Sequence, residues 1–259
     1  MNNKIFSGGN MRTFDTALFK DELFKVFEIN GLSSLIDDER AEKLALLTEI
    51  MLEENQKYNL TAIKETDKII LLHYADSLMT ASLFGENSSV IDVGCGAGFP
   101  SVPLAICRPD LKITAMDSTA KKVNYVDMVS NELSLNITAV CARAEDAAKA
   151  GSKDSFREKF DIATARAVAD LSVLSELCLP LVKVGGSFAV MKGKNGKEEL
   201  TRAKKGISIL GGRIEAEKEF LLTDTKGETY ERVSAVIRKE KETSALYPRS
   251  YSQITKKPL

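Results

Sequence analysis

The stretch VIDVGCGAGFP, residues 90–100, joins a short β-branched run to three alternating glycines and a proline. The run at residues 90–93 predicts a buried strand, and Gly94, Gly96 and Gly98 predict a sharp turn into the helix that follows. Glycines let a ligand approach the backbone without a Cβ clash. We therefore expect a binding site at this turn, at the carboxyl edge of a sheet.

The spacing of these glycines is GxGxG, whereas dinucleotide-binding turns have GxGxxG. Pro100 and Pro103 stand where the helix should begin, and prolines there remove amide donors that a phosphate would use. The turn therefore favours an uncharged or zwitterionic ligand over a diphosphate.

Strand and helix patterns alternate after this turn. Strands are predicted at residues 90–93, 112–116, 137–141, 161–164 and 187–191, and two late strands at 220–222 and 233–237 are predicted to form an edge hairpin. The alternation predicts an α/β fold with a mostly parallel, doubly wound, seven-stranded sheet.

The segment before the sheet has apolar residues at helical spacing. One helix is predicted to be capped by Asp37 or Asp38, and another to cover about residues 67–84. We divide the chain into a disordered lead (1–13), an N-terminal helical region (14–86), a Rossmann-like core (87–240) and a basic tail (241–259).

The composition limits the kinds of site and the location that we expect for the protein. His73 is the single histidine, and the four cysteines lack metal-site spacing, so a metal site and a Ser-His-Asp triad are not expected. No apolar run suits a membrane span or a signal core, which predicts a cytoplasmic protein. The net charge is −1, but residues 183–213 hold eight Lys or Arg against two Asp or Glu, so basic charge gathers late in the chain.

Asp117 ends the second predicted strand, 23 residues after Gly94. A carboxylate at that position can accept hydrogen bonds from both ribose hydroxyls of an adenosine, although it could instead cap the next helix. The third strand ends at RAED, residues 143–146, where the adenine is expected.

Several ordered motifs then resemble the RsmG (GidB) family. They are NLTAI at 59–63, HYADSL at 73–78, DVGCGAGFPSVPLA at 92–105, RAED at 143–146, TARAVADLSVLSELCLPL at 164–181, MKG at 191–193 and YPR…KKPL at 247–259. Family members often carry Gly and Pro where this chain has Ser252 and Ile254.

The resemblance implies a Rossmann-like class I methyltransferase that uses S-adenosylmethionine to methylate guanine N7 in 16S ribosomal RNA. It implies that the protein acts on this RNA or on the small ribosomal subunit, and we expect a monomer. The residues predicted to bind the cofactor are Gly94, Gly96, Gly98, Phe99, Asp117, Ala144, Glu145 and Arg166.

The expected chemistry is modest, because guanine N7 carries a lone pair and no proton. Methyl transfer to N7 needs aligned reactants and no covalent nucleophile, metal or obligatory base. The [DN]PP[YF] motif of exocyclic-amine methyltransferases is absent, and no cysteine lies in a loop suited to pyrimidine C5 chemistry.

Three residues are candidates for the catalytic site. Arg166 ends the fourth strand and could pair with the methionine carboxylate or hold guanine O6, or simply pair with Asp161 or Asp170. Lys192 ends the fifth strand, and the alternative for it is a solvated strand end without a function. Asn59 interrupts a helical period, and the alternative for it is a plain turn.

The residues predicted to contact RNA are His73, Arg143, Lys192, Arg202, Arg249, Lys256 and Lys257. His73 could instead be a core histidine whose hydrogen bonds are satisfied within the protein, and Arg143 could simply close a strand. The other basic residues could belong to a solvated surface and not to a phosphate-binding one. The sequence leaves two rival functions. The first is a nicotinamide-dependent oxidoreductase on the same fold, but the glycine spacing differs from GxGxxG and the chain has no Tyr-x-x-x-Lys pair. The second is a non-catalytic RNA-binding protein, which would not need the glycine turn and Asp117.

Overall fold

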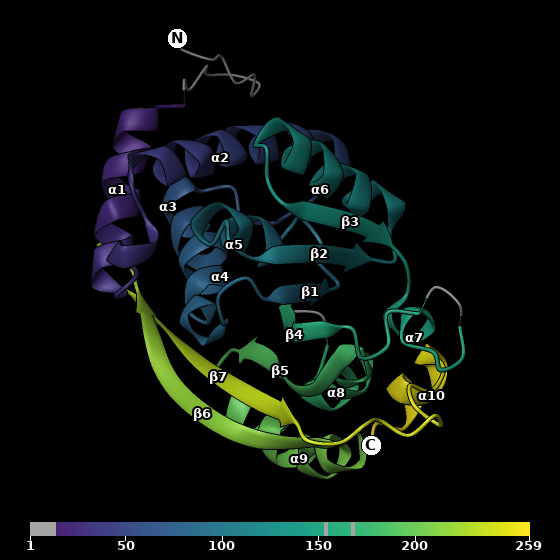
Figure 1. Ribbon diagram of the computed structural model, residues 1–259. Coiled ribbons are helices and arrows are strands. Elements are labelled where there is room, and N and C mark those ends of the chain that lie inside the picture. Colours follow the sequence, from purple (N-terminus) through teal and green to yellow (C-terminus); the bar gives the residue numbers. More distant parts are fainter. Residues whose placement is uncertain (1–13, 153–154, 167–168) are drawn as a thin grey trace.

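The computed structural model describes residues 14–152, 155–166 and 169–259 (Figure 1). The predicted disordered lead, residues 1–13, lies outside the described residues. The described strands form one seven-stranded sheet in the order β3-β2-β1-β4-β5-β7-β6. They are β1 (Ser89–Val93), β2 (Lys112–Asp117), β3 (Ile137–Cys141), β4 (Phe160–Arg166), β5 (Val182–Lys192), β6 (Gly212–Thr223) and β7 (Thr229–Lys239).

The first five strands run parallel to one another, and β7 runs antiparallel to both β5 and β6. At the centre of the sheet, Val90 of β1 pairs in register with Ile113 of β2 and Ile162 of β4. The strand order reverses between β2 and β4, and ligands of doubly wound folds bind at such a reversal. The predicted mostly parallel, doubly wound sheet is confirmed.

Helices cover both faces of the sheet (Figure 1). The α-helices are α1 (Thr16–Ile29), α2 (Asp38–Tyr58), α3 (Thr66–Ile69), α4 (Asp76–Leu78), α5 (Ser101–Cys107), α6 (Ala120–Glu132), α7 (Ala144–Ala147), α8 (Leu171–Cys178), α9 (Gly196–Ile209) and α10 (Tyr251–Lys256). Short 3₁₀ or π turns are η1 (Ser33–Leu35), η2 (Ile70–Ala75), η3 (Ala81–Leu83) and η4 (Leu179–Leu181).

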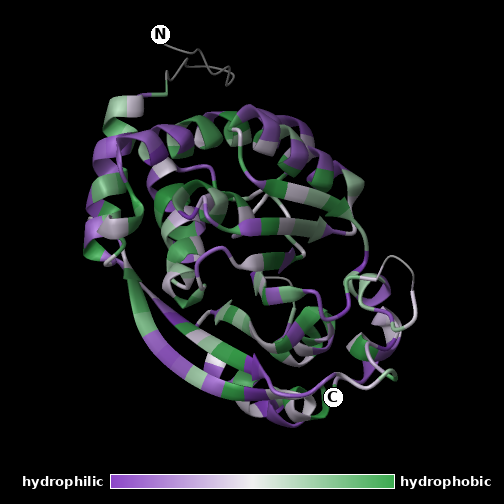
Figure 2. Cartoon of the chain, viewed as in Figure 1, coloured by the Kyte–Doolittle hydropathy of each residue, from purple (hydrophilic) through white to green (hydrophobic). Residues whose placement is uncertain are grey.

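Alternating side chains of β1 build two hydrophobic cores. Val90 packs with residues of α1, α2, α5 and α6 on one face, whereas Ile91 and Val93 pack with residues of α8 and α9 on the other. Successive side chains of a strand point to opposite faces, so one apolar run serves both layers. Figure 2 shows polar and apolar residues alternating along the outer helices α2 and α6, as amphipathic helices require.

The N-terminal helices begin at acidic caps. Asp15 accepts hydrogen bonds from the amides of Ala17 and Leu18, and Asp37 accepts one from the amide of Arg40. Of the two residues proposed to cap the second helix, Asp37 is therefore the cap. These bonds satisfy amides that have no partner within the first helical turn.

The helix predicted over residues 67–84 is interrupted. α3 passes into the π-helical turn η2, then into α4 and η3. A π turn holds one extra residue, so it changes the direction of the side chains that follow, and such turns are frequent at functional sites. His73 lies within η2 and Asp76 directly after it.

The late hairpin is longer than predicted. The prediction gave strands at 220–222 and 233–237, whereas β6 covers Gly212–Thr223 and β7 covers Thr229–Lys239. Charged side chains occupy the exposed face of β6, which is largely polar in Figure 2. They conceal its alternating pattern from a search for apolar runs.

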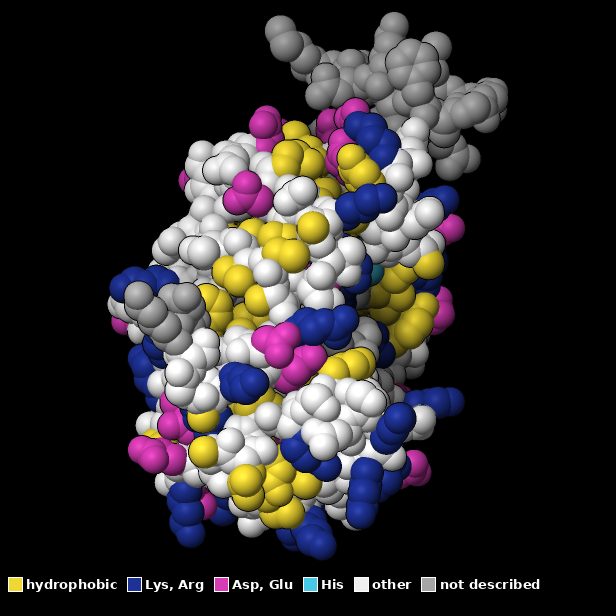
Figure 3. Space-filling model, turned by 90° about the vertical axis from the view of Figure 1, so that its right-hand side faces the viewer, with side chains coloured by type: hydrophobic (Ala, Val, Ile, Leu, Met, Phe, Trp, Pro, Cys, Tyr) yellow, Lys and Arg dark blue, Asp and Glu magenta, His cyan; other side chains and the backbone are white. Residues whose placement is uncertain are grey.

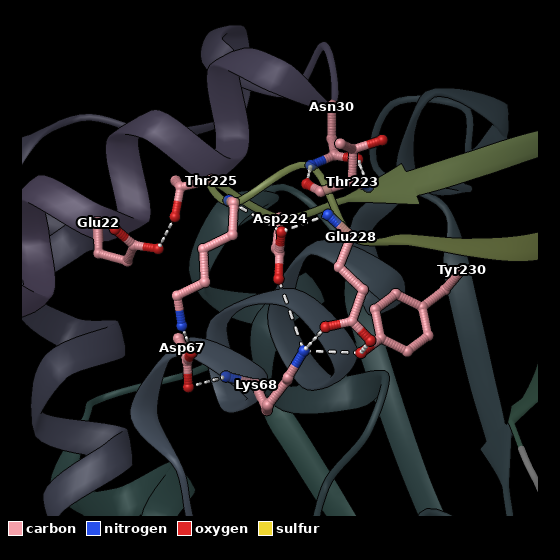
Figure 4. Close-up of polar contacts among 10 residues, drawn as sticks. Glu22, Asn30, Asp67, Lys68, Thr223, Asp224, Thr225, Glu228 and Tyr230 are labelled. Carbon is pink, nitrogen blue, oxygen red and sulfur yellow. Dashed lines mark hydrogen bonds and ion pairs between the residues drawn. The ribbon is translucent and has the colours of Figure 1, made fainter.

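The tip of this hairpin docks on the N-terminal helices (Figure 4). Asn30, at the end of α1, donates to the Thr223 carbonyl and accepts from the Thr223 amide, at 2.8 and 3.0 Å. Lys68 of α3 reaches Glu228 and Tyr230, both at 2.7 Å. These bonds join the helical region to the last two strands, although about 160 to 190 residues separate them in the chain.

Figure 3 looks onto the side of the molecule to which β2 and β3 point in Figure 1. Hydrophobic side chains lie in the middle of this face, and Lys and Arg side chains are spread over its lower part. Within the described residues, no helix combines the length and apolar character that crossing a membrane requires.

Candidate active site

A cavity of about 530 Å³ lies at the carboxyl ends of β1, β2 and β4. This is the edge at which the glycine turn was expected to bind a ligand. Nine residues singled out from the sequence line it: His73, Gly94, Gly96, Phe99, Asp117, Arg143, Ala144, Glu145 and Arg166. The structure therefore gathers most of the predicted cofactor residues in one place.

The glycine turn is held against the end of β2. The amides of Gly94 and Cys95 both donate to the Met116 carbonyl, at 2.8 and 2.9 Å. Gly96 lines the cavity and has a φ of +57°, a conformation that favours glycine; an added Cβ would meet only the Gly94 carbonyl oxygen, at 3.9 Å. A ligand can therefore approach the backbone at Gly96 closely.

Gly98, also predicted to bind the ligand, is not among the residues that line the cavity. A Cβ at this position would come within 2.5 Å of Val102 in α5, so the third glycine allows α5 to pack against the turn.

Asp117 faces the cavity with its carboxylate partly occupied. One oxygen accepts from the Gly96 amide at 3.1 Å and the other from the Thr119 amide at 2.9 Å. The cap position of α6 belongs to Thr119. A carboxylate has about four acceptor sites, so Asp117 keeps capacity for two ligand hydroxyls. Lys122, 3.6 Å from Asp117, adds positive charge beside it.

The loop after β3 forms the neighbouring wall. Ala144 and Glu145 begin α7 and are buried, while the Arg143 side chain is exposed over half of its surface and lies 3.7 Å from Glu145. The Arg143 guanidinium also lies 5.9 Å from the centre of the Tyr251 ring. Tyr251 was not predicted to belong to the site.

Arg166 ends β4, on the other side of β1 from Asp117, and also lines the cavity. Its guanidinium donates to the Leu72 carbonyl at 2.5 Å, to Asp76 at 3.2 Å and to Nδ1 of His73 at 3.0 Å, and it lies 5.2 Å from the centre of the Phe99 ring. The partner is Asp76 and neither Asp161 nor Asp170, the two residues considered from the sequence.

The contacts of His73 define its protonation. Burial, helped by the charge of Arg166, lowers the pKa of His73 to about 3, so the ring is neutral. Because arginine only donates, Nδ1 accepts, and Nε2 therefore donates to Thr61 Oγ1 at 2.9 Å. The ring also stacks on Phe99 with centroids 4.3 Å apart. Both nitrogens are occupied, which fits a satisfied core histidine better than the predicted RNA contact.

A second cavity of about 560 Å³ shares Arg166 with the first. Asp76 in its wall binds Arg166 through one oxygen and Arg232 of β7 through the other, at 3.2 and 2.8 Å. Lys192 lies here and not in the first cavity, and it pairs with Glu199 at 2.9 Å. Sequence reasoning missed Asp76 and Arg232, because neither ends a predicted parallel strand.

The remaining candidates lie outside both cavities. Asn59 is exposed and ends α2 in a left-handed conformation, as a plain turn would, although the next two residues line the first cavity. Arg202 pairs with Asp170 at 2.7 Å on the surface. Arg249 is turned inward onto Glu176, so it is less accessible to RNA than predicted. Lys256 and Lys257 are exposed.

One buried carboxylate stands behind the glycine turn. Asp92 accepts from the amide and hydroxyl of Ser101 through Oδ2, at 3.2 and 2.8 Å, and its Oδ1 has no hydrogen-bond partner in the structure. Burial raises the pKa of Asp92 to about 6, while the bonds from Ser101 oppose this shift. An unpartnered buried acceptor is costly and is a feature of binding sites.

Nucleophilic and metal chemistry find little support in the cavity. Cys95 lines it, but burial raises the pKa of the thiol, so the reactive thiolate is disfavoured. Among the residues that the structure describes, no three His, Cys, Asp or Glu side chains gather as metal ligands would.

A glycine turn after β1, an acid ending β2 and an antiparallel β7 between β5 and β6 define a Rossmann-like class I methyltransferase. A structural relative supports this fold. The structure of a putative transferase from Pyrococcus horikoshii matches with a TM-score of 0.50 and 14% identity, over 64% of this chain and 63% of that one.

The family model described as GidB, rRNA small subunit methyltransferase G, matches residues 40–224. A protein named ribosomal RNA small subunit methyltransferase G from Lactobacillus helveticus is 40% identical over 90% of this chain and 97% of its own length. One with the same name from a Geobacillus species is 46% identical over 82% and 87%. The chain belongs to the GidB family and is a methyltransferase, so the predicted family is confirmed.

Proposed function

We propose that the protein transfers the methyl group of S-adenosylmethionine to N7 of a guanine in 16S ribosomal RNA. The observation that carries this proposal is the first cavity, which is lined by Asp117 at the end of β2 and by Arg166 at the end of β4, on a chain of this family. The names of the GidB relatives support ribosomal RNA of the small subunit as the substrate. Such a substrate implies a cytoplasmic protein, and we propose that it acts as a monomer.

The residues of the cavity fit the donor. The free acceptor sites of Asp117 suit two ribose hydroxyls, and the Arg166 guanidinium suits the methionine carboxylate. The unpartnered Oδ1 of Asp92 adds negative potential behind the turn, which favours a ligand with ammonium and sulfonium charges. Gly94, Gly96, Phe99, Ala144 and Glu145 supply the remaining walls.

When bound, the donor would supply a methyl group on a positively charged sulfur; guanine N7 would take the methyl group and the positive charge, while the electrons of the C–S bond would stay with sulfur. The protein has to align the two reactants and exclude water; general bases and nucleophiles are not required. The neutral state of His73 agrees with this, because its ring orients Arg166 and Phe99 and adds no charge.

The second cavity is the proposed place of the acceptor guanine. It adjoins the first through Arg166 and contains Arg232 and Lys192 together with Asp76 and Glu199. Guanine O6 accepts hydrogen bonds from cations such as arginine, while its N1–H and N2–H₂ groups donate to carboxylates. The carboxylates would also stabilise the cationic product. Lys192 thus keeps a proposed role at the acceptor, together with Arg166.

The RNA backbone has a basic surface available. Arg202 lies on α9, and Lys256 and Lys257 lie at the end of α10. Arg143 and Asn59 are exposed near the mouth of the first cavity. Phosphate contacts of this kind position a nucleic acid without reading its sequence.

Calorimetric titration with S-adenosylmethionine tests the cofactor assignment. We expect the wild-type protein to bind it and Asp117→Ala to lose at least a hundredfold in affinity, because two charge-assisted hydrogen bonds disappear. Asp127→Ala is the matched control, since Asp127 is an exposed carboxylate on the neighbouring α6, away from the cavity. Binding of NADH in place of S-adenosylmethionine would refute the assignment.

The substrate is tested by methylation of small-subunit RNA that lacks the modification. We expect one labelled guanine, mapped by chain cleavage at N7-methylguanine, and loss of the label with Asp117→Ala. Label on another base, or on the large-subunit RNA only, would contradict the proposed acceptor.

A further inference from the structure

The C-terminal segment returns to the first cavity. α10 is the last helix of the chain, yet Tyr251 at its start lines the same cavity as Asp117, Arg143 and Glu145. More than a hundred residues separate Tyr251 from Arg143. Figure 1 shows α10 beside α7, the helix that follows β3.

An ion pair holds this segment in place. Glu176 of α8 is fully buried and accepts hydrogen bonds from three nitrogens of Arg249: the amide at 2.8 Å, Nε at 2.9 and 3.2 Å to the two carboxylate oxygens, and Nη2 at 2.6 Å. The residue after Glu176, Leu177, lines the cavity. The anchor of the tail and the wall of the cavity are therefore neighbours on one helix.

Packing and capping fix the helix itself. Ile254 of α10 is fully buried in the second core, and Ser250 and Gln253 form a capping box at the start of the helix. These contacts hold the backbone of α10, while the Tyr251 side chain, at 42% exposure, remains accessible. A tyrosine has few rotatable bonds, so such a ring offers a contact surface at small entropic cost.

We propose that Tyr251 forms the outer wall of the adenine subsite, contacting the adenine ring of the methyl donor. The inference rests on the proposed function, because Asp117 and the Arg143–Glu145 loop define where the adenosine lies. Arg143 approaches the tyrosine ring at 5.9 Å and the loop residues Ala144 and Glu145 are buried, so the flat ring and the loop bound the same end of the cavity. Aromatic rings favour offset or edge contacts with another planar ring.

The proposal makes the C-terminal segment a part of cofactor binding. The basic side chains Lys256 and Lys257 follow at the end of the same short helix, where they face solvent. An alternative use of Tyr251 is to stack on a base of the RNA, because single-stranded bases also stack on aromatic side chains. The two uses differ in a measurable way, since only the first changes the affinity for the donor in the absence of RNA.

Affinity for S-adenosylmethionine and S-adenosylhomocysteine, measured by calorimetry without RNA, gives the first test. We expect Tyr251→Ala to weaken both ligands by about 3- to 10-fold and Tyr251→Phe to stay within twofold of the wild type. Tyr58→Ala is a matched control, because Tyr58 is also about half exposed and also has a cation, Lys121, 6.0 Å from its ring centre. It does not line the cavity.

The chain contains no tryptophan, which allows a second test. Tyr251→Trp introduces a single indole whose emission should change on saturation with S-adenosylhomocysteine, whereas the emission of Tyr58→Trp should not. Unchanged affinity in Tyr251→Ala together with silent emission in Tyr251→Trp would overturn the adenine wall while leaving the donor assignment intact. Failure of the wild-type protein to bind either ligand would instead overturn the proposed function and this inference with it.

Discussion

Asp92→Asn tests the energetic cost of the buried carboxylate behind the glycine turn. The Asp92 pKa is about 6 in the folded protein against an ordinary value of 3.8, so folding favours the protonated form. The stabilising contribution of protonation is complete below pH 3.8 and is lost as pH rises through 6. Asparagine does not titrate, and its amide oxygen can still accept from Ser101.

The difference of about two pKa units corresponds to about 3 kcal/mol, at about 1.4 kcal/mol per unit. The free energy of unfolding of Asp92→Asn minus that of the wild type should therefore increase with pH. The part of this difference that comes from the ionisation of Asp92 is about 1.5 kcal/mol at pH 5 and about 3 kcal/mol at pH 7.5. Burying the new amide N–H₂ group adds a cost that is the same at both pH values.

Urea unfolding of both proteins at pH 5, 6 and 7.5 measures this difference. The expected result is an increase of about 1.5 kcal/mol between pH 5 and pH 7.5, with unchanged dependence on urea concentration. A difference that stays constant across this range would refute the reasoning, because it would mean that Asp92 is not protonated near pH 5. We also expect the variant to bind the donor less well, since a stabilised site commonly loses function.

Two further changes test the hairpin tip and the tail. Asp224→Ala removes the acceptor for the amides of Lys226 and Glu228, at 2.9 and 2.8 Å, and the ion pair with Lys68 of α3 at 3.5 Å, so the free energy of unfolding should fall by about 2 kcal/mol in a urea titration. An unchanged midpoint would show that these contacts of the hairpin tip do not contribute to stability. Charge reversal of Lys256 and Lys257 should weaken RNA binding and make the slope of log affinity against log salt shallower by roughly 1 to 2; an equal slope would mean that these side chains do not contact phosphate.

The fold was accessible from the sequence where side-chain patterns are local. The apolar run before Gly94 and the acid at Asp117 predicted two neighbouring strand ends, and the structure brings them within hydrogen-bonding distance through the Gly96 amide. The central strands β1 and β4 are buried along most of their length, so their sequences are mostly apolar. Only residues 220–222 of β6 were predicted as a strand, because the exposed face of β6 carries charged residues.

The rest of the site depends on contacts between distant segments. Asp76 pairs with Arg232, 156 residues away, and Tyr251 reaches a cavity formed mainly by residues 93–145. No local pattern indicates such partners. The π turn η2 is equally hidden, because one extra residue per turn disturbs a helical period only slightly. The ion pair of Arg249 with Glu176 could not be predicted either, since Glu176 lies 73 residues earlier in the chain, within the apolar helix α8.

Arg166 borders both cavities, and its guanidinium is held by the Leu72 carbonyl and His73 of η2 and by Asp76, which directly follows η2. A single cation thus borders both the proposed donor cavity and the proposed acceptor cavity. Adjusting the recognition of either substrate at this position would disturb the other, so adaptation to a different nucleotide would have to proceed through Arg232 or Lys192, which lie in the second cavity alone.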